Sequence, residues 1–187
     1  MHGGPSMGKA VSRIALYALV ALSIITPIRL WVAQPFVISG NSMIPAFQPG
    51  DYLVVDELSY RSAAPQRGDV IIFEYPLDPE LVFIKRIVGL PGEGVHIRDG
   101  VVSIMGTNST TTHILIEPYR ATAVVQKEKF DVLLHDDEYY VLGDNRDGSS
   151  DSRVWGPLTK KFIVGRVAMR MLPLSRATIF SCDISVY

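Results

Sequence analysis

Apolar residues follow two patterns along this chain. From Ile14 to Ala33 they run almost without interruption, as IALYALVALSIITPIRLWVA, and Arg29 is the only charged residue among them. After this run, apolar residues occur in short stretches that alternate with polar residues or continue for a few positions, and Gly, Pro and Asp separate the stretches. The first pattern predicts one apolar helix, and the second predicts a series of β-strands.

The apolar run is long enough to cross a membrane as a helix. Its 20 residues extend about 30 Å in an α-helix, which is the thickness of the hydrocarbon core of a bilayer. We therefore expect residues 14–33 to form a transmembrane anchor. Lys9 and Arg13 precede this run, and because positive charges stay on the cytoplasmic side, the N-terminus is expected in the cytoplasm and the remainder outside.

Two other interpretations of this run stay open. A cleaved signal peptide would explain a basic segment followed by only 15 uninterrupted apolar residues, from Ile14 to Ile28. Cleavage after Ala33 fits that interpretation poorly, because Trp31 and Val32 precede the bond where a small-x-small pattern is typical. A helix buried in a protein core is the third interpretation, but the run lacks a polar face at helical spacing.

The short apolar stretches predict eight strands. Asp99-Gly100 separates two of them, and because such a turn needs positive φ angles that Gly adopts freely, it predicts a hairpin. No later stretch has the length and periodicity of an amphipathic helix. The fold class expected is therefore mainly β, a coiled or barrel-like β domain preceded by one N-terminal transmembrane helix. The expected strands are Gln34–Ser39, Tyr52–Asp56, Asp69–Tyr75, Val82–Gly89, Val95–Arg98, Val101–Met105, Tyr139–Leu142 and Phe162–Met171.

The region from Gly106 to Glu138 has the weakest pattern. It begins with the polar and repetitive segment GTNSTTTH at residues 106–113, which predicts a loop. The remainder of this region predicts no definite element.

Length and composition describe the expected domain. The chain has 187 residues, of which 48% are hydrophobic, and this content is typical of a globular domain and not of a disordered chain. A net charge of -1 argues against a nucleic-acid binder, which would carry a strongly basic surface. This average combines a charge of +3 on residues 1–32 with -4 on residues 33–187. The charge pattern therefore also separates the expected anchor from the expected domain.

Several common kinds of active site are excluded by missing residues. Cys182 is the only cysteine, so the chain forms neither an internal disulfide nor a thiolate zinc site. The four histidines lack the spacing of metal ligands, and the nucleophile-elbow motif of α/β-hydrolases does not occur. We therefore expect no metal, no cofactor and no nucleotide. A hydrolase with this sequence would need a base other than histidine.

Lys85 is a candidate for that base. Phe83, Lys85 and Ile87 share one face of an expected strand, so the ammonium lies between two apolar side chains. Burial lowers the pKa of a lysine from about 10.4, and a value near about 7 gives a neutral amine at neutral pH. A neutral amine accepts a proton from a serine hydroxyl and so activates a nucleophile. The alternative is a lysine at a strand edge whose charged end reaches water.

Two further segments contain unusual residue choices. Ser42 lies in the segment SGNSMIP, and the segment GDNRDGSSDSRVWG extends from Gly143 to Gly156. Taken separately, each has a simple interpretation: Ser42 as a turn serine, and residues 143–153 as a solvated Asp/Gly loop. The residue sequences of these segments and their order along the chain together favour another interpretation.

With these segments in this order, the chain resembles the bacterial type I signal peptidases. These are membrane-anchored serine proteases that remove signal peptides from exported preproteins. The resemblance extends from about Arg29 to about Pro173. The matching segments are GNSMIP, PGD at residues 49–51, RGDVIIF at residues 67–73, FIKRIVGLPGE and GDNRDGSSDSRVWGPL.

The resemblance implies a role for each matching residue. Ser42 is the expected nucleophile, and its backbone N–H is expected to form part of the oxyanion hole. Lys85 is the expected general base, and Ser149 matches the family's serine that orients this lysine by a hydrogen bond. Five charged residues are expected to hold the neighbouring loop through ion pairs, and their alternative is surface pairs worth about 0 to 1 kcal/mol. These residues are Arg86, Asp144, Arg146, Asp151 and Arg153.

The sequence departs from the family's pattern at Gly40. Some members have a serine at this position and use its hydroxyl as the second oxyanion donor. Ser39 and Asn41 are candidates for that donor here, and a water molecule or the substrate-bound geometry would be the alternative. The tail from Leu174 to Tyr187 matches no segment of the family.

The resemblance also implies a location and partners. The expected enzyme is a single-pass protein of the bacterial plasma membrane, with its catalytic domain on the extracytoplasmic face. Its expected partners are the signal peptides of preproteins and the lipid bilayer, with no nucleic acid. The expected parts are a cytoplasmic N-terminus at residues 1–13, the anchor at 14–33, the catalytic domain at 34–173 and an unassigned tail at 174–187.

Two alternatives share part of this pattern. A self-cleaving repressor of the SOS-response type resembles the chain in its Ser-Lys chemistry and its β fold, but it would begin with a DNA-binding helix-turn-helix. A membrane-tethered binding protein that has lost activity would lack Ser42 or Lys85. Here the chain begins with an apolar run, and both residues are present.

Overall fold

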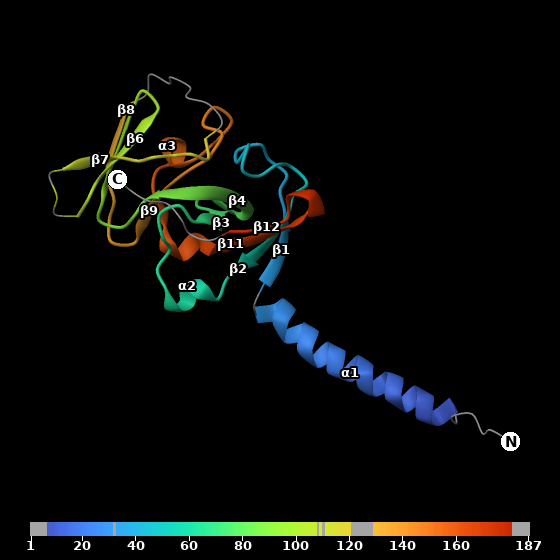
Figure 1. The fold of residues 1–187 in the computed structure, drawn as a ribbon. Coiled ribbons are helices and arrows are strands. Elements are labelled where there is room, and N and C mark those ends of the chain that lie inside the picture. The colour runs from blue at the N-terminus through green and yellow to red at the C-terminus, as the bar shows by residue number, and fades with distance from the viewer. Residues whose placement is uncertain (1–6, 32, 108, 110, 121–128, 181–187) are drawn as a thin grey trace.

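The computed structural model describes residues 7–31, 33–107, 109, 111–120 and 129–180, with their side chains except at residues 7, 9, 24–31, 33 and 34. The described residues form one long helix and two β-sheets (Figure 1). The helices are α1 (Met7–Trp31), α2 (Ser59–Ser62) and α3 (Ser152–Trp155), with 3-10 turns η1 (Lys160–Phe162) and η2 (Leu174–Arg176). The strands are β1 (Ala33–Val37), β2 (Tyr52–Asp56), β3 (Val70–Tyr75), β4 (Asp78–Gly89), β5 (Gly94–Arg98), β6 (Val101–Met105), β7 (Thr112–Ile114), β8 (Lys129–Leu133), β9 (Glu138–Leu142), β10 (Leu158–Thr159), β11 (Ile163–Leu172) and β12 (Thr178–Ile179).

The strands divide between a larger and a smaller sheet. The larger sheet has the order β1-β2-β11-β3-β4-β9-β10, with β12 paired to β11, and the smaller sheet has the order β7-β6-β5-β8. Figure 1 shows the smaller sheet at the end of the molecule away from α1. Among the described strands neither sheet closes on itself, so the mainly β prediction is confirmed and the barrel-like core is wrong. The hairpin of β5 and β6 pairs with β7 and β8 instead of continuing the larger sheet.

Strand β3 explains why the larger sheet contains continuous apolar runs. Val70 and Ile72 belong to one buried cluster, whereas Ile71 and Phe73 belong to another. Because successive side chains of a strand point to opposite faces, this strand is buried on both faces. Each fully buried side chain of this size contributes about 1.5 to 3 kcal/mol to stability. The strand therefore gives its neighbour β4 a rigid position.

Most predicted strands are confirmed. The bounds of β2 and β6 are those predicted, and the other six predicted strands differ from the observed ones only at their ends. Four strands were not predicted, namely β7, β8, β10 and β12. Of these, β7 lies partly inside the loop predicted at residues 106–113, which is wrong at residues 112 and 113. Its polar residues have no apolar alternation, and pairing with β6 makes them a strand.

The predicted hairpin is confirmed at Asp99-Gly100. Asp99 has φ 48 and Gly100 has φ 78, so both central residues of the turn have positive φ angles. Arg98 lies opposite Val101 in the antiparallel pair that the turn joins. A turn of this kind matches the twist of the two strands.

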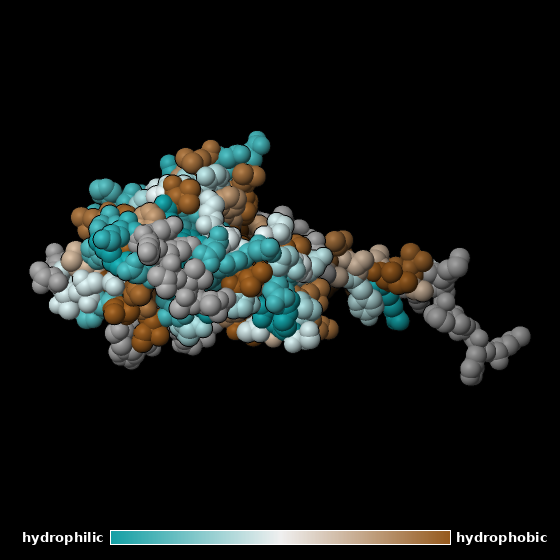
Figure 2. All heavy atoms as spheres, turned by 90° about the horizontal axis from the view of Figure 1, so that it is seen from above, coloured by the Kyte–Doolittle hydropathy of each residue, from teal (hydrophilic) through white to brown (hydrophobic). Residues whose placement is uncertain are grey.

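Helix α1 confirms the predicted helix but extends further toward the N-terminus. Figure 1 shows it projecting from the β-sheets, and β1 begins two residues after its end. Its described side chains from Ala10 to Ser23 are exposed, and they include apolar ones such as Leu19 and Leu22. Figure 2 shows hydrophobic (brown) side chains along the projecting helix. Within the part of the chain that the structure describes, no helix combines the length and the hydropathy needed to cross a membrane. The predicted transmembrane anchor is therefore not confirmed.

Candidate active site

Ser42 lies in a turn that the core holds in place. Met43 and Phe47 are fully buried, and Phe47 N donates to Met43 O at 2.8 Å. Ile38 N donates to Asp51 O at 3.1 Å, which joins the two ends of the segment. Because the apolar residues on its C-terminal side are fixed, Ser42 is held half-buried at the end of β1.

Lys85 meets Ser42 from strand β4. It lies opposite Ile71 of β3 and is 4% exposed, so the interpretation of a charged end in water is wrong. Lys85 Nζ lies 2.9 Å from Ser42 Oγ and 2.9 Å from the backbone oxygen of Ile84, and it donates to both. The fold therefore brings together a hydroxyl and an amine that are 43 positions apart in the sequence.

The surroundings of Lys85 favour the neutral amine. Burial lowers the pKa of Lys85 from 10.5 to about 8, although the negative charges of Asp151 and Asp144 oppose this change. The ring of Phe83, whose centroid is 5.3 Å from Nζ, forms part of the apolar wall. The pKa of Lys85 is thus lowered, as the strand pattern predicted. At a slightly alkaline pH, about half of the Lys85 side chains are neutral and able to accept a proton.

The loop after β9 packs against the turn of Ser42. Asn145 N donates to Ser42 O at 2.9 Å, and its side-chain amide donates to Asn41 O at 3.2 Å. A Cβ added at Gly143 would lie 2.6 Å from Ser42 O and 2.3 Å from Ser149 Oγ. Because neither distance is possible for a real Cβ, only glycine allows the loop to approach Ser42 this closely.

Ser149 lies next to Gly143 in this loop, and its predicted role remains a prediction. Its Oγ is buried and makes no hydrogen bond with any described residue. Lys85 donates to Ser42 and to Ile84 O instead. The structure thus brings Ser149 to the loop without the hydrogen bond to Lys85 that the resemblance implies.

The five supporting charged residues form two linked groups. Asp144 accepts hydrogen bonds from Arg86 Nε at 2.8 Å and from Arg86 Nη2 at 2.7 Å. Asp151 accepts one from Arg153 Nε at 2.8 Å, and Arg153 Nη2 donates to Arg146 O at 2.6 Å. The side chains of both aspartates are fully buried. The interpretation as surface pairs is therefore wrong, and the loop is solvated only in part, at Asp147, Gly148 and Ser150.

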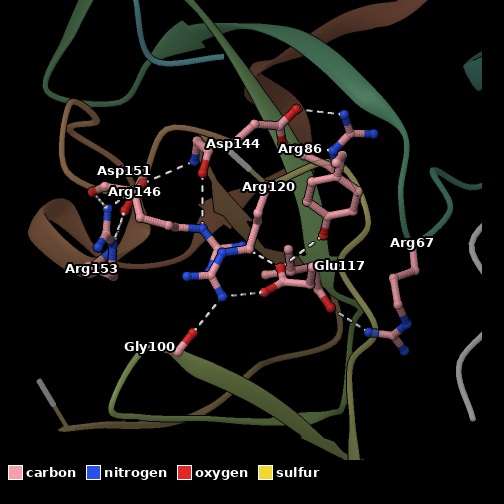
Figure 3. Close-up of polar contacts among 12 residues, drawn as sticks. Arg67, Arg86, Gly100, Glu117, Arg120, Asp144, Arg146, Asp151 and Arg153 are labelled. Carbon is pink, nitrogen blue, oxygen red and sulfur yellow. Dashed lines mark hydrogen bonds and ion pairs between the residues drawn. The ribbon is translucent and has the colours of Figure 1, made fainter. Parts of the chain in front are cut away.

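Glu117 belongs to the same network, and the sequence pattern did not reveal it. It lies between β7 and β8, where no element was predicted, and its side chain is 5% exposed. Its carboxylate binds Arg146 and Arg120, as Figure 3 shows. A single acidic residue in a segment without periodicity is no signal by itself, so only the folded chain identifies this residue.

A cavity of about 380 Å³ opens beside the two reactive groups. Apolar side chains such as Phe36 and Ile38, from β1 and the residue after it, and Val82 of β4 line it. A cavity of this size with an apolar lining holds small apolar groups of a ligand. Residues of β1, β3 and β4 and of the loop after β9 line the cavity next to Ser42, so it can accept side chains of a bound peptide.

The second oxyanion donor stays open. Ser39, Gly40 and Asn41 lie along the cavity next to Ser42. Gly40 has no hydroxyl, and the backbone oxygen of Asn41 is already an acceptor for the side chain of Asn145. Ser39 and Asn41 remain the candidates on this chain.

The fold and the site together define a class of protein. A mainly β domain that places a serine hydroxyl against a buried lysine, beside an apolar cavity, has the arrangement of a hydrolase whose base is lysine. Among the described residues, no group of three or more His, Cys, Asp or Glu side chains could hold a metal ion. The chain belongs to the signal peptidase family, peptidase S26, whose family model matches residues 11–172. This membership decides against the self-cleaving repressor.

Individual relatives agree with this family. The chain is 36% identical over 165 residues to the probable signal peptidase I-1 of Synechocystis sp., a match that covers 84% of this chain and 81% of that protein. It is 35% identical to the signal peptidase I of Leptolyngbya laminosa, with 90% and 81% covered. A crystal structure of a signal peptidase I from Enterococcus faecalis matches 56% of this chain and 97% of that chain, with 30% identity and a TM-score of 0.47. The chain is an enzyme that hydrolyses peptide bonds, of the signal peptidase I class.

Proposed function

We propose that this chain is a membrane-anchored serine endopeptidase that removes N-terminal signal peptides from exported preproteins with Ser42 and Lys85. The observation that carries the proposal is the hydrogen bond of 2.9 Å between Lys85 Nζ and Ser42 Oγ, next to an apolar cavity. A serine hydroxyl is a weak nucleophile until a base removes its proton. The buried amine of Lys85 is the base within reach.

The reaction then follows in two stages. Ser42 Oγ attacks the carbonyl carbon of the scissile bond while its proton moves to the neutral Lys85 amine. The oxyanion that forms accepts a hydrogen bond from the Ser42 N–H. When the C–N bond breaks, Lys85 gives its proton to the leaving amine and Ser42 carries the signal peptide as an ester. Water activated by Lys85 hydrolyses the ester and restores both groups.

The remaining site residues act through position. Ser149 is proposed to orient Lys85, the role that the family's pattern assigns to it. Arg86, Asp144, Arg146, Asp151 and Arg153 are proposed to hold the loop against Ser42 through their buried ion pairs. The cavity beside Ser42 is proposed to bind small side chains of the substrate on the N-terminal side of the cleaved bond.

The location is proposed from the first part of the sequence. Residues 14–33 would form the anchor, residues 1–13 would remain in the cytoplasm, and the catalytic domain at 34–173 would face the extracytoplasmic side. The apolar run, the basic residues before it and the exposed apolar side chains of α1 support this proposal. An anchor keeps the active site at the surface where the cleavage region of a preprotein emerges. This raises the local concentration of the cleavage region at the active site.

The function is tested by cleavage of a preprotein with detergent-solubilised enzyme. Ser42→Ala and Lys85→Ala are each expected to lower kcat at least about 1,000-fold, because each removes one member of the reacting pair. Ser62→Ala and Lys160→Ala, which change exposed residues outside the site, are the matched controls and should keep the wild-type rate. Cleavage by Ser42→Ala at the wild-type rate would show that the proposed mechanism is wrong.

A further inference from the structure

Glu117 is a buried carboxylate between the smaller sheet and the proposed active site. Oε1 accepts a hydrogen bond from Arg146 Nη2 and another from the hydroxyl of Tyr119 at 2.9 Å. Oε2 accepts one from Arg120 Nη1 at 3.2 Å. The side chains of Glu117, Arg146 and Arg120 are 5%, 7% and 15% exposed. Figure 3 shows these groups converging on the carboxylate.

The first connection from Glu117 reaches the loop of the site through Arg146. Arg146 Nε donates to the backbone oxygen of Gly143 at 3.0 Å. Gly143 is the residue whose close approach to Ser42 O excludes any side chain. Gly143 N also donates to Asp151 Oδ2 at 3.0 Å, so the two ends of the loop meet at this glycine. Holding Arg146 therefore holds the part of the loop that touches the turn of Ser42.

The second connection runs through Tyr119. The guanidinium of Arg86 lies over the Tyr119 ring, 4.0 Å from its centroid, and Arg86 in turn binds both carboxylate oxygens of Asp144. Arg86 directly follows Lys85 on β4. Glu117 thus contacts, through one residue on each route, the backbone of the loop and the neighbour of the proposed base.

The opposite side of Glu117 is attached to the smaller sheet. Arg120 Nη1 donates to the backbone oxygen of Gly100 at 2.7 Å, in the turn between β5 and β6. A buried carboxylate is stable only when donors compensate for its lost hydration, and here two arginines and a tyrosine supply them. The carboxylate therefore has a fixed position, and it holds the side chains of Arg146, Arg120 and Tyr119 that donate to it.

We propose that Glu117 is a positioning residue for peptide-bond cleavage, which holds Arg146 and Tyr119 so that the loop from Gly143 to Ser149 stays in register with Ser42 and Lys85. This inference rests on the proposed function of that pair. Glu117 touches neither Ser42 nor Lys85 and does not line the cavity, so it acts on the arrangement of these two groups through the loop that it holds. Small displacements of reacting groups cost as much as about 100-fold in rate.

The test compares Glu117→Gln with Glu93→Gln in the preprotein assay. Glutamine keeps the size of the side chain but removes the charge that pairs with both arginines. Glu93 is a matched control because it forms another buried pair, with Arg67, at side-chain exposures of 13% and 10%. We expect Glu117→Gln to lower kcat at least about tenfold with KM changed less than about twofold. Glu93→Gln should leave both constants within about twofold of wild type.

A measurement of the coupling between Glu117 and Arg146 distinguishes a positioning role of Glu117 from a general loss of stability. In a double-mutant cycle, Glu117→Gln and Arg146→Gln together should lower kcat about as much as either alone, because they break the same contact. Glu117→Gln and Glu93→Gln should have independent effects. Multiplicative effects of Glu117→Gln and Arg146→Gln, or equal kcat values for Glu117→Gln and Glu93→Gln, would overturn the inference.

A milder variant covers the case in which Glu117→Gln does not fold. Tyr119→Phe removes one hydrogen bond to the carboxylate and keeps the ring below Arg86, so it should lower kcat about threefold with unchanged KM. A wild-type kcat for this variant would overturn the inference. The proposed function fails separately, because active Ser42→Ala or Lys85→Ala variants contradict it and the Tyr119→Phe result does not bear on it.

Discussion

Burying the charged amine of Lys85 costs free energy, and this cost lowers the pKa of the side chain. An ammonium loses its hydration at a position that is 4% exposed, so the neutral form is favoured. The nearby carboxylates of Asp144 and Asp151 would restore the charged form, but each is bound to a buried arginine. Their charges are largely compensated, and the pKa of Lys85 stays low at about 8.

This pKa predicts how the rate depends on pH. Only the neutral amine accepts the proton of Ser42, so kcat/KM should rise about tenfold for each pH unit below about 8 and level off above it. The measurement is cleavage of a peptide substrate without titratable groups from about pH 6 to about pH 10, with the folded state of each sample checked by circular dichroism. A rate that is constant over this range, or that falls as the pH rises toward 8, would contradict a lysine base.

The sequence predicted the candidate pair Ser42 and Lys85 but not how tightly the two residues are enclosed. The alternation of Phe83, Lys85 and Ile87 placed the lysine on an apolar face, and burial confirms this. The charged loop after β9 has the composition of a solvated turn, but Asp144, Arg146 and Asp151 are buried because each finds a partner within the network. Partners distant in the chain, such as Glu117 for Arg146, leave no local signal.

At the scale of elements, the loop after β9 is the part that completes the site. It begins at Gly143 directly after β9 and ends at α3, whose first turn is capped by the Asp151 carboxylate. Asn145 joins it to the turn of Ser42 by two hydrogen bonds. The loop therefore has a fixed position between β9, the strand next to the edge of the larger sheet, and Ser42.

This close approach predicts the effect of a single methyl group. Gly143→Ala would bring a Cβ within 2.6 Å of Ser42 O, so the loop must move away. We expect kcat to fall at least about 100-fold and the free energy of unfolding to fall by about 1 to 3 kcal/mol. Gly106→Ala is the control, because its nearest neighbour would be Ser109 Cβ at an ordinary 3.7 Å. Similar rates for the two variants in the preprotein assay would refute the steric argument.

The strands that were predicted and those that were missed differ in what makes them form. Strands such as β2 and β6 contain alternating apolar residues that bury one face, and their bounds follow from the sequence. Strand β7, at one edge of the smaller sheet, carries mostly polar residues and exists because β6 offers free backbone groups. Strand β8, at the other edge, does alternate, since Phe130 and Val132 pack against the core while its other residues are exposed, but the pattern is only five residues long. Local pattern therefore predicts β2 and β6, and pairing decides β7.

The described molecule has three parts: α1, the larger sheet with the proposed catalytic pair, and the smaller sheet. The proposed pair lies entirely on the larger sheet and its loops. The smaller sheet packs on β4 and β9 through a buried cluster that includes Val88 and Leu142. The segment that carries Glu117 adds a polar connection, because it binds the turn between β5 and β6 on one side and Arg146 on the other.

The proposed anchor is tested on the complete chain in bacterial membranes. Wild-type protein should remain with the membrane after an alkaline wash, because the described side chains of its apolar run, from Ile14 to Ser23, are exposed. Replacing both Leu19 and Leu22 by Arg should release most of the protein, since each charge costs about 2.5 to 3.5 kcal/mol in the bilayer centre. Leu133→Arg, at an exposed position on β8, is the control and should leave the protein in the membrane fraction. Equal retention of the two variants would contradict the anchor.

The sequence by itself determined the mainly β class, the position of the long helix, the hairpin at Asp99-Gly100 and the candidate pair Ser42 and Lys85. These depend on short-range properties: the period of apolar residues, the φ angles that a turn needs and the order of motifs. The tertiary structure alone decided that the sheets stay open, that Ser42 and Lys85 lie 2.9 Å apart and that Glu117 joins their surroundings. These features depend on contacts between residues far apart in the chain, which only packing and the compensation of buried charges select.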